Sequence, residues 1–426
     1  MIKYKGIQTS YSPTKEGLQT RNVMIEDTNI EKVYRISDDK IEDVELNFKR
    51  YLYQDIDWDS RLVCLKGPRG VGKTTILLQH IKECFEPGQA LYVSLDNIWI
   101  NVREVYELAE HHLAHGGTHL FLDEVHKAGD WQNLIKSLND DLKRLHVVYT
   151  GSSLLKIEKQ GGDLSRRQIQ YFLPGLSFRE YLKFEGIADF KPLRLEDLLR
   201  GHIQFARKVR GKFPVLKHFN AYLEHGYYPF YKDNPRHFPS QVMQVVNQVL
   251  DVDYPEIEDV EVATISKARR MLSVLAASCP QTPNMAKLYA QLETDRKNGL
   301  KILYALERAG LLALLSSQRR ETLKSMSTPD KILCDNTNLL SALASDTNKG
   351  SIRETFFMNA VRHSSHKLSY PEQGDFLVDG KYLFEVGGKG KGFDQIKDVQ
   401  NSFVAQDDVE VGFGNKIPLW LFGFLY

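Results

Sequence analysis

The sequence predicts an α/β protein that begins with a doubly wound parallel sheet and continues into a helical segment and a final α+β domain. Two observations carry this prediction. Short apolar runs at 61–66, 90–95, 118–122 and 145–149 are separated by segments of helical length, a pattern typical of parallel strands buried on both faces. A glycine-rich motif directly follows the first run and directly precedes a helical pattern.

The composition excludes the disordered, collagen-like and membrane-spanning classes. Of 426 residues, 42% are hydrophobic and 26% are charged, and 56 basic against 55 acidic side chains leave a net charge of +1. Nucleic-acid binding would therefore require a local basic patch. The four cysteines form no C-x-x-C pair, so neither zinc nor disulfides are indicated. With no apolar leader or span, we expect a cytoplasmic protein without a membrane partner.

The remaining elements are expected in the following order. A fifth strand covers 168–173, and Ser177 caps a helix that opens a helical lid. Three helices then begin near Val262, Pro283 and Asp295, and a strand at 311–315 leads into the polar turn QRRETLKS, an order that resembles a winged helix. A helix containing RETFFMNAV precedes the final strands, which we expect at 375–378, 381–386 and 417–425.

The motif after the first strand matches G-x-x-x-x-G-K-T and indicates a phosphate-binding loop. Its glycines allow backbone N–H groups to surround a phosphate chain at the start of a helix. Lys73 would hold the β- and γ-phosphates of ATP, and Thr74 would bind Mg²⁺. The nucleotide-binding residues predicted here are Gly67, Pro68, Arg69, Gly70, Val71, Gly72, Lys73, Thr74 and Thr75.

The apolar run LFL ends in two acids, Asp123 and Glu124, where a Walker B motif belongs. Asp123 would join Thr74 at the Mg²⁺ ion, and Glu124 would act as the base for the attacking water. At the tip of the next strand, Thr150 and Ser152 are candidate sensors of the γ-phosphate, although Thr150 or Ser153 is equally suited to cap the following turn.

Two arginines follow a glycine pair. Arg166 or Arg167 is a candidate to stabilise the transferred phosphoryl group, in the same chain or in a neighbouring one, and the sequence does not rank them; a solvated basic loop is the alternative. Lys73, Glu124 and these arginines are the predicted catalytic residues.

The motifs GPRGVGKTT, LFLDEVH, YTGSS and SRRQIQYFLPGLSFREYL resemble those of the bacterial and archaeal AAA-family ATPases that carry a winged helix and a C-terminal domain similar to PD-(D/E)xK nucleases. The resemblance implies ATP and Mg²⁺ as cofactors and coupling between the nucleotide state and the C-terminal domain. It is also compatible with a homo-oligomer. In this family a polar run follows the Walker B acids, as His126 and Lys127 do here; His126 is either structural or bonded near the nucleotide.

On this basis we divide the chain into five parts, which are an N-terminal segment (1–45), an AAA-type P-loop core (46–190), a helical lid (191–261), a winged helix (262–330) and a nuclease-like domain (331–426). The predicted function is an ATPase that couples its nucleotide state to the last two parts and acts on or near DNA. The alternative is a nucleotide-dependent switch that binds a protein partner through an inactive nuclease-like domain.

The nuclease-like domain offers Glu354, Asp375 and Glu385 as carboxylates, and the last two are candidate metal ligands. A two-residue turn at Asp379-Gly380 would put Asp375 and Glu385 on opposite faces of the sheet, whereas a three-residue turn pairing Leu377 with Lys381 would bring them onto one face.

The lysine that this family places two residues after the glutamate is replaced by Gly387, and Lys389 lies too far along an extended strand to substitute for it. We therefore expect no efficient cleavage of DNA. The third helix of the winged helix carries Lys297, Lys301, Tyr304 and Arg308 on one stripe, which either meets DNA phosphates or is a solvated face.

Overall fold

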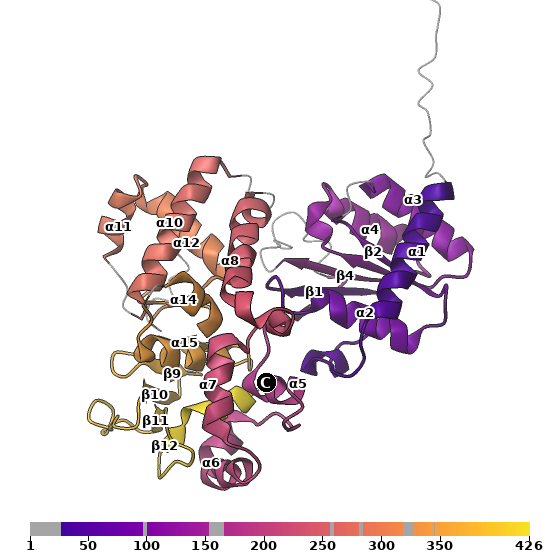
Figure 1. The fold of residues 1–426 in the computed structure, drawn as a ribbon. Helices are drawn as coiled ribbons and strands as arrows, with labels where there is room; N and C mark the ends of the chain where they lie inside the picture. The colour runs from indigo at the N-terminus through magenta and orange to yellow at the C-terminus, as the bar shows by residue number, and fades with distance from the viewer. Residues whose placement is uncertain are drawn as a thin grey trace, which may run out of the picture.

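The chain folds into two lobes that meet around one short helix, α5 (Figure 1). In this computed structural model, the described residues are 27–96, 100–152, 166–255, 260–280, 284–317, 328–344 and 346–426. The first 26 residues, Ser153, Pro283 and the turn QRRETLKS lie outside them. Among the helices of the described residues, none has the length and apolar character that a bilayer crossing demands.

The first lobe is built on a parallel sheet with the strand order β2-β3-β4-β1-β5. All five predicted strands are present, as β1 (Leu62–Gly67), β2 (Ala90–Ser94), β3 (His119–Asp123), β4 (His146–Ser152) and β5 (Ile169–Phe172). Because β4 lies between β1 and β3, the ends of these three strands meet at one edge. The phosphate-binding loop and the Walker B acids are therefore neighbours.

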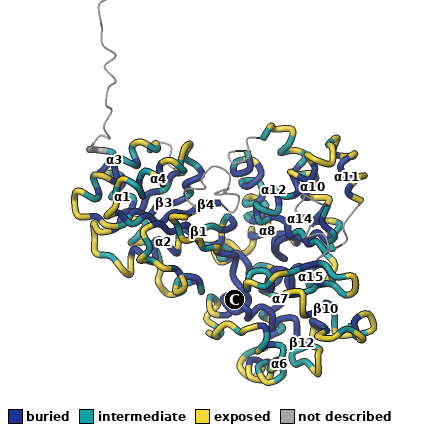
Figure 2. The backbone as a smooth tube through the Cα atoms, turned by 180° about the vertical axis from the view of Figure 1, so that it is seen from behind, coloured by how far each residue is buried: buried dark blue, intermediate teal, exposed yellow. Residues whose placement is uncertain are grey.

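Both faces of this sheet are buried, as the continuous apolar runs predict. Val63 and Leu65 join one apolar cluster, whereas Leu62 and Cys64 join another, since side chains alternate along a strand. Figure 2 shows the buried strands at the centre of the lobe. The surrounding helices are α1 (Asp27–Asp43), α2 (Lys73–Cys84), α3 (Val102–Ala114) and α4 (Trp131–Asp141), with the short 3-10 helices η1 (Tyr51–Gln54) and η2 (Val125–Lys127).

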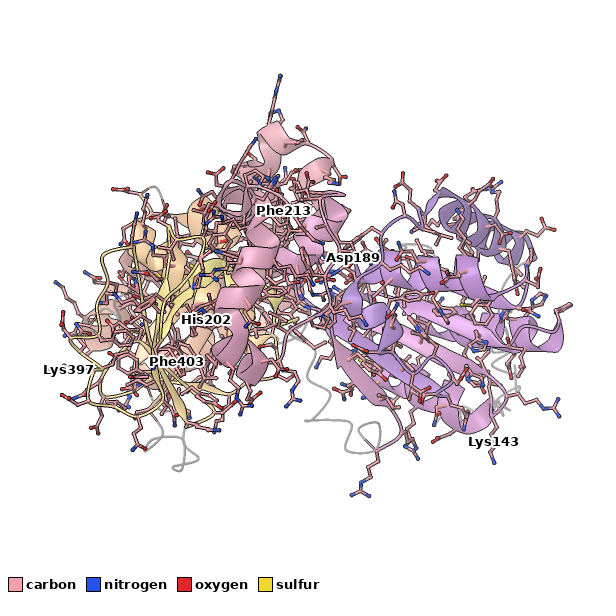
Figure 3. All side chains as sticks on the ribbon, turned by 90° about the horizontal axis from the view of Figure 1, so that it is seen from below. Lys143, Asp189, His202, Phe213, Lys397 and Phe403 are labelled. Atoms are coloured by element: carbon pink, nitrogen blue, oxygen red, sulfur yellow. The ribbon has the colours of Figure 1, made fainter. Side chains whose placement is uncertain are left out.

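The predicted helical lid consists of helices and short connecting segments in its described residues. Ser177 caps its first helix as expected, and Glu180 accepts a hydrogen bond from the Ser177 backbone in return. The elements are α5 (Phe178–Phe184), α6 (Leu195–Arg210), α7 (Val215–His225), η3 (Pro229–Lys232), η4 (Pro235–His237), α8 (Phe238–Gln248) and the π-helical turn η5 (Val249–Asp253). His202 of α6 faces the last sheet and contacts the Gly414 carbonyl (Figure 3).

The next segment contains the three expected helices and a two-stranded antiparallel ribbon. They are α10 (Val262–Ser278), α11 (Met285–Gln291), α12 (Arg296–Arg308), β6 (Leu312–Leu315) and β7 (Lys331–Cys334). Asp295 caps α12 through the Asn298 N–H, as predicted. The second helix begins at Met285 because Asn284, rather than Pro283, supplies its cap.

The chain ends in a mixed sheet with the order β12-β11-β10-β9-β8, preceded by α14 (Thr337–Leu343) and α15 (Lys349–Arg362). Its strands are β8 (Leu368–Ser369), β9 (Phe376–Val378), β10 (Tyr382–Gly387), β11 (Ser402–Gln406) and β12 (Lys416–Pro418). The predicted strand 417–425 is wrong beyond Pro418, where the 3-10 helix η6 (Leu419–Phe424) begins. All of η6 is buried, and a wholly apolar run does not reveal its period.

Neither predicted register of the β9–β10 hairpin is correct. Val378 pairs with Tyr382, and Phe376 pairs with Phe384, so the turn spans three residues but is shifted from the three-residue alternative. The turn uses left-handed backbone at Asp379 and Gly380. Continuing this register places Asp375 opposite Glu385 on one face of the sheet.

Candidate functional site

The phosphate-binding loop joins β1 to α2 at the carboxyl edge of the first sheet. Gly70 and Gly72 have φ angles of 80° and 95°, which are readily accessible to glycine. The Lys73 ammonium donates to the carbonyl oxygens of Gly67 and Pro68, each at 3.1 Å. The loop thus points a buried lysine and the first N–H groups of α2 toward one place, as the motif predicts.

A hydrogen-bond network links this loop to the end of β3. Asp123 accepts a bond of 2.7 Å from the Thr74 hydroxyl and one of 2.8 Å from the Tyr92 hydroxyl. The Thr150 hydroxyl at the tip of β4 donates to the other Asp123 oxygen and accepts from the Glu124 N–H at 3.0 Å. Thr74 and Asp123 are therefore adjacent oxygen donors, which is the chemistry Mg²⁺ prefers.

Glu124 stands at the rim of the same site in a left-handed backbone conformation, with φ of 54°. Non-glycine residues adopt this region at an energetic cost, and such residues cluster at functional sites. One carboxylate oxygen lies 3.9 Å from the Lys73 ammonium, and the other lies 3.4 Å from His126 Nε2. Glu124 is thus held beside the lysine of the loop.

A cavity of 410 Å³ opens beside the loop, with a volume suited to a small-molecule ligand. Beyond the loop it is walled by residues from before β1 and from the helical segment. Phe48 and Phe184 form an aromatic pair there, with ring centroids 4.8 Å apart. The lining residues outside the loop and α2 are Glu45, Asn47, Phe48, Arg50, Glu124, Phe184, Pro229, Phe230 and Asp233.

Phe230 of η3 packs directly on the loop. A Cβ atom at Gly70 would lie 2.7 Å from the Phe230 ring, so glycine is required there by contact as well as by φ. Phe48, Phe184 and Phe230 belong to no sequence motif, since aromatic residues are common in their neighbourhoods and none of them is singled out. Only their closeness in the fold marks them.

Arg50 is another residue of the site that belongs to no sequence motif. It is buried before β1, donates to the Val71 carbonyl at 2.6 Å and reaches both oxygens of Glu180, at 2.9 and 3.1 Å. It also donates to the carbonyls of Pro174 and Gly175. Burial alone would raise the pKa of Glu180, but the Arg50 guanidinium holds that pKa below its usual value. Arg50 thereby ties the phosphate-binding loop to α5.

The two predicted arginines do not enter this site. Arg166 and Arg167 precede β5, whose Ile169 pairs with Val63, so they lie at the amino edge of the sheet. The distance along the strand from Val63 to the loop at Gly67 is about 13 Å, since it spans four residues. Arg167 contacts Asp140 of α4 at 3.3 Å. A role for either arginine in the same chain is therefore wrong, and a role in a neighbouring chain stays a prediction.

The other predicted residues line the same edge of the sheet. Ser152 is buried at the end of β4, where it pairs in register with Gly67 of the loop. Thr75 is exposed and lines the cavity from the first turn of α2. The Arg69 guanidinium lies 3.7 Å from Asp253.

A second cluster of charged residues lies in the last domain. The Lys331 ammonium is 2.5 Å from the Glu354 carboxylate and 3.6 Å from that of Asp375. Asp375 also accepts a bond of 2.8 Å from the Val386 N–H, and the buried Glu385 pairs with Lys391. Burial raises the pKa of Glu354, and the neighbouring Asp375 adds to this effect. Two lysines thus offset part of the charge of the three carboxylates.

Lys391, four residues beyond Gly387, lies close to the position that the lysine of the motif would take. A Cβ atom at Gly387 would lie 2.7 Å from the Lys391 side chain, so the Lys391 stem fills the space that a side chain at 387 would take. Lys389, the lysine considered in the sequence analysis, is exposed. Within the described ranges, no three His, Cys, Asp or Glu side chains are arranged to hold a metal ion.

The basic stripe of α12 is shorter than predicted. Lys297 and Lys301 are exposed, whereas Tyr304 and Arg308 are half-buried, and Tyr304 packs against the apolar core. Two lysines alone form a weak patch for a phosphate backbone.

The fold and the site are those expected of a P-loop nucleotide-binding domain, and the comparison with protein families is consistent with the AAA class. Residues 59–182 match a family described as "AAA domain". Residues 216–350 match a domain of unknown function (DUF8612). AAA domains generally bind and hydrolyse ATP with Mg²⁺, and the adjacent Thr74 and Asp123 oxygens fit such an ion.

Among curated proteins, the uncharacterized protein MJ1637 of Methanocaldococcus jannaschii is 25% identical over 382 residues, covering 82% of this chain and 80% of that protein. The uncharacterized protein MJ1544 of the same organism is 25% identical over 175 residues, or 40% of this chain, which spans only 36% of that protein. A solved structure reported for katanin self-assembly has 21% identity and a TM-score of 0.25, covering 38% of this chain and 58% of that one.

Proposed function

We propose that this protein binds ATP with Mg²⁺ at the carboxyl edge of its first sheet and hydrolyses it. The observation that carries the proposal is the convergence of Lys73, Thr74, Asp123, Glu124 and Thr150 at one edge of the cavity. These residues come from the start of α2 and from the carboxyl ends of β3 and β4.

Each residue has a distinct role in this proposal. Lys73 and the N–H groups of the loop bind the phosphates, and Thr74 with Asp123 holds Mg²⁺. The metal ion, when bound, neutralises the charge of the phosphate oxygens. Glu124 orients a water molecule and accepts its proton, while Thr150 fixes the Glu124 backbone through the bond to its N–H.

The contacts of the loop with the helical segment support coupling between nucleotide state and the second lobe. Arg50 ties Val71 to α5, and Phe230 packs on Gly70. A nucleotide bound in the cavity would contact both the phosphate-binding loop and the helical segment, since residues of both line the cavity. Hydrolysis would then change the contacts that hold the two lobes together.

For the second lobe we propose the winged-helix and nuclease-like folds, and we favour an inactive nuclease-like domain that binds a protein partner. Lys331 pairs with Glu354 and Asp375, and Lys391 pairs with Glu385, so two positive charges offset two of the three negative charges and weaken the attraction for a divalent cation. The short basic stripe of α12 gives DNA binding less support. We also propose that the protein associates with copies of itself. A cytoplasmic location completes the proposal, since four free cysteines suit a reducing compartment.

ATP turnover measured with and without duplex DNA tests these statements together. We expect Mg²⁺-dependent release of phosphate that Glu124→Gln removes, and little stimulation by DNA at physiological salt. Release that is unchanged in Glu124→Gln would contradict the ATPase proposal. Stimulation by DNA that falls steeply with salt would instead favour action on DNA.

A further inference from the structure

Asp253 brings a buried carboxylate from the second lobe into the nucleotide site. It ends the π-helical turn η5, which follows α8 and belongs to the segment that matches the domain of unknown function. Its side chain is only 2% exposed. Turns of π-helix inside α-helices frequently mark functional positions. Neither the nucleotide motifs nor the comparisons assign a role to this residue.

Three side chains of the nucleotide motifs surround the same Asp253 oxygen. Lys127 donates a bond of 3.2 Å, His126 Nε2 lies at 3.6 Å, and the Arg69 guanidinium lies at 3.7 Å. Arg69 comes from the phosphate-binding loop, and the other two follow the Walker B acids. One carboxylate of the second lobe therefore contacts both motifs of the first.

His126 is placed between two carboxylates. Its Nε2 atom is 3.4 Å from Glu124 and 3.6 Å from Asp253, and the imidazole is almost fully buried. Neither ring nitrogen makes a hydrogen bond of good geometry with the described residues. Because Nε2 carries one proton at most, the imidazole can donate it to only one carboxylate at a time.

We infer that Asp253 is a positioning residue for ATP hydrolysis, which keeps His126 from occupying the Glu124 carboxylate. When His126 donates to Asp253, the Glu124 oxygens remain available to accept the proton of the attacking water. When Asp253 moves away with η5, His126 donates its proton to the Glu124 carboxylate instead. Glu124 is then less able to accept the proton of the attacking water. Hydrolysis would thus proceed only while η5 of the second lobe is docked against the nucleotide site. This inference rests on the proposed ATPase function and deepens it.

The experiment compares Asp253→Asn with the parent protein and with Asp251→Asn. Asp251 lies on the same turn, is exposed and pairs with Arg269, so it is a matched control outside the cluster. We expect Asp253→Asn to lower kcat about tenfold or more, a modest part of what a general base supplies. The KM for ATP should stay within about threefold, since the variant leaves the contacts of Lys73 and Thr74 unchanged. The control should behave as the parent does.

A second variant separates this role from a merely structural one. In the Asp253→Asn background, His126→Phe keeps a ring but removes the donor, so kcat should recover by several-fold. A structural role for Asp253 predicts no recovery, because the double variant would be at least as damaged as the single one. Thermal unfolding and binding of a fluorescent ATP analogue show whether each variant is folded.

The outcomes distinguish the inference from the function on which it rests. A parent that releases no phosphate, or an unaltered rate in Glu124→Gln, contradicts the ATPase proposal. A parent that hydrolyses ATP while Asp253→Asn keeps its kcat overturns the inference alone. Failure of His126→Phe to restore any activity to Asp253→Asn overturns it as well.

Discussion

The guanidinium of Arg50 binds both carboxylate oxygens of Glu180, a residue 130 positions later, and the two side chains are buried together. The same guanidinium reaches the Val71 carbonyl in the phosphate-binding loop. A paired charge at this depth is stable only while its partner is present. This one interaction therefore joins the start of the chain, the loop and α5.

Replacing Arg50 should strongly destabilise the protein. Arg50→Met leaves Glu180 buried without its partner, and we expect a loss of about 3–5 kcal/mol in the free energy of unfolding. Arg103→Met is the control, since Arg103 forms an exposed pair with Glu107 on one helix face and should cost about 0–1 kcal/mol. Urea unfolding measures both; equal losses would contradict the role of Arg50.

The Arg50–Glu180 pair also predicts a pH dependence of stability. The folded protein holds the pKa of Glu180 below its usual value, so the carboxylate adds stability above its unfolded pKa, and this stability is lost as pH falls through the folded value. Glu180→Gln should be less stable than the parent at pH 7, with the difference shrinking at acidic pH. Unfolding curves across this range check it, and a difference that widens on acidification would refute it.

Lys73→Ala should weaken nucleotide binding. The change removes a charge-assisted contact to the phosphates, for which we expect a loss of about 1.5–3 kcal/mol in binding free energy. Titration with a fluorescent ATP analogue gives the affinity. Lys82→Ala, on the same helix but bonded to the Glu42 and Val44 carbonyls, should bind as the parent does. Unchanged affinity in Lys73→Ala would show that the nucleotide binds elsewhere.

Glu124→Gln should separate binding from hydrolysis. The amide has nearly the shape of the carboxylate but does not accept the proton of water, so ATP should bind while turnover falls about 10²-fold or more. Loss of the charge also removes the contacts with Lys73 and His126. Phosphate release at saturating ATP is the measurement, and turnover at the parent rate would place the base at another residue.

The last domain should not cleave DNA efficiently. Lys331 and Lys391 offset two of the three charges of Glu354, Asp375 and Glu385, which weakens binding of a divalent cation. Incubation of plasmid with the protein and Mn²⁺ should leave the plasmid intact, in the parent and in Asp375→Ala alike. Cleavage by the parent that disappears in Asp375→Ala would overturn this prediction and point to Lys391 as the lysine of the reaction.

The sequence by itself determined the strands of the first sheet, the phosphate-binding loop and the Walker B acids, because each is encoded by residues contiguous in the chain. Apolar runs buried on both faces and a glycine motif between strand and helix need no distant partner to be recognised. Tertiary structure decided the residues that cross between lobes. Phe230 on Gly70, Asp253 beside His126 and Arg50 with Glu180 are contacts between segments that no local pattern relates.

The wrong predictions also concern features that depend on tertiary structure. The hairpin register depended on the backbone of Asp379 and Gly380, and η6 was mistaken for a strand because burial on all sides leaves no period to read. Arg166 and Arg167 are candidates by sequence because they follow a glycine pair, yet the direction of β5 carries them to the far edge of the sheet. Sequence motifs state which chemistry is present, whereas strand order and packing decide which side chains meet.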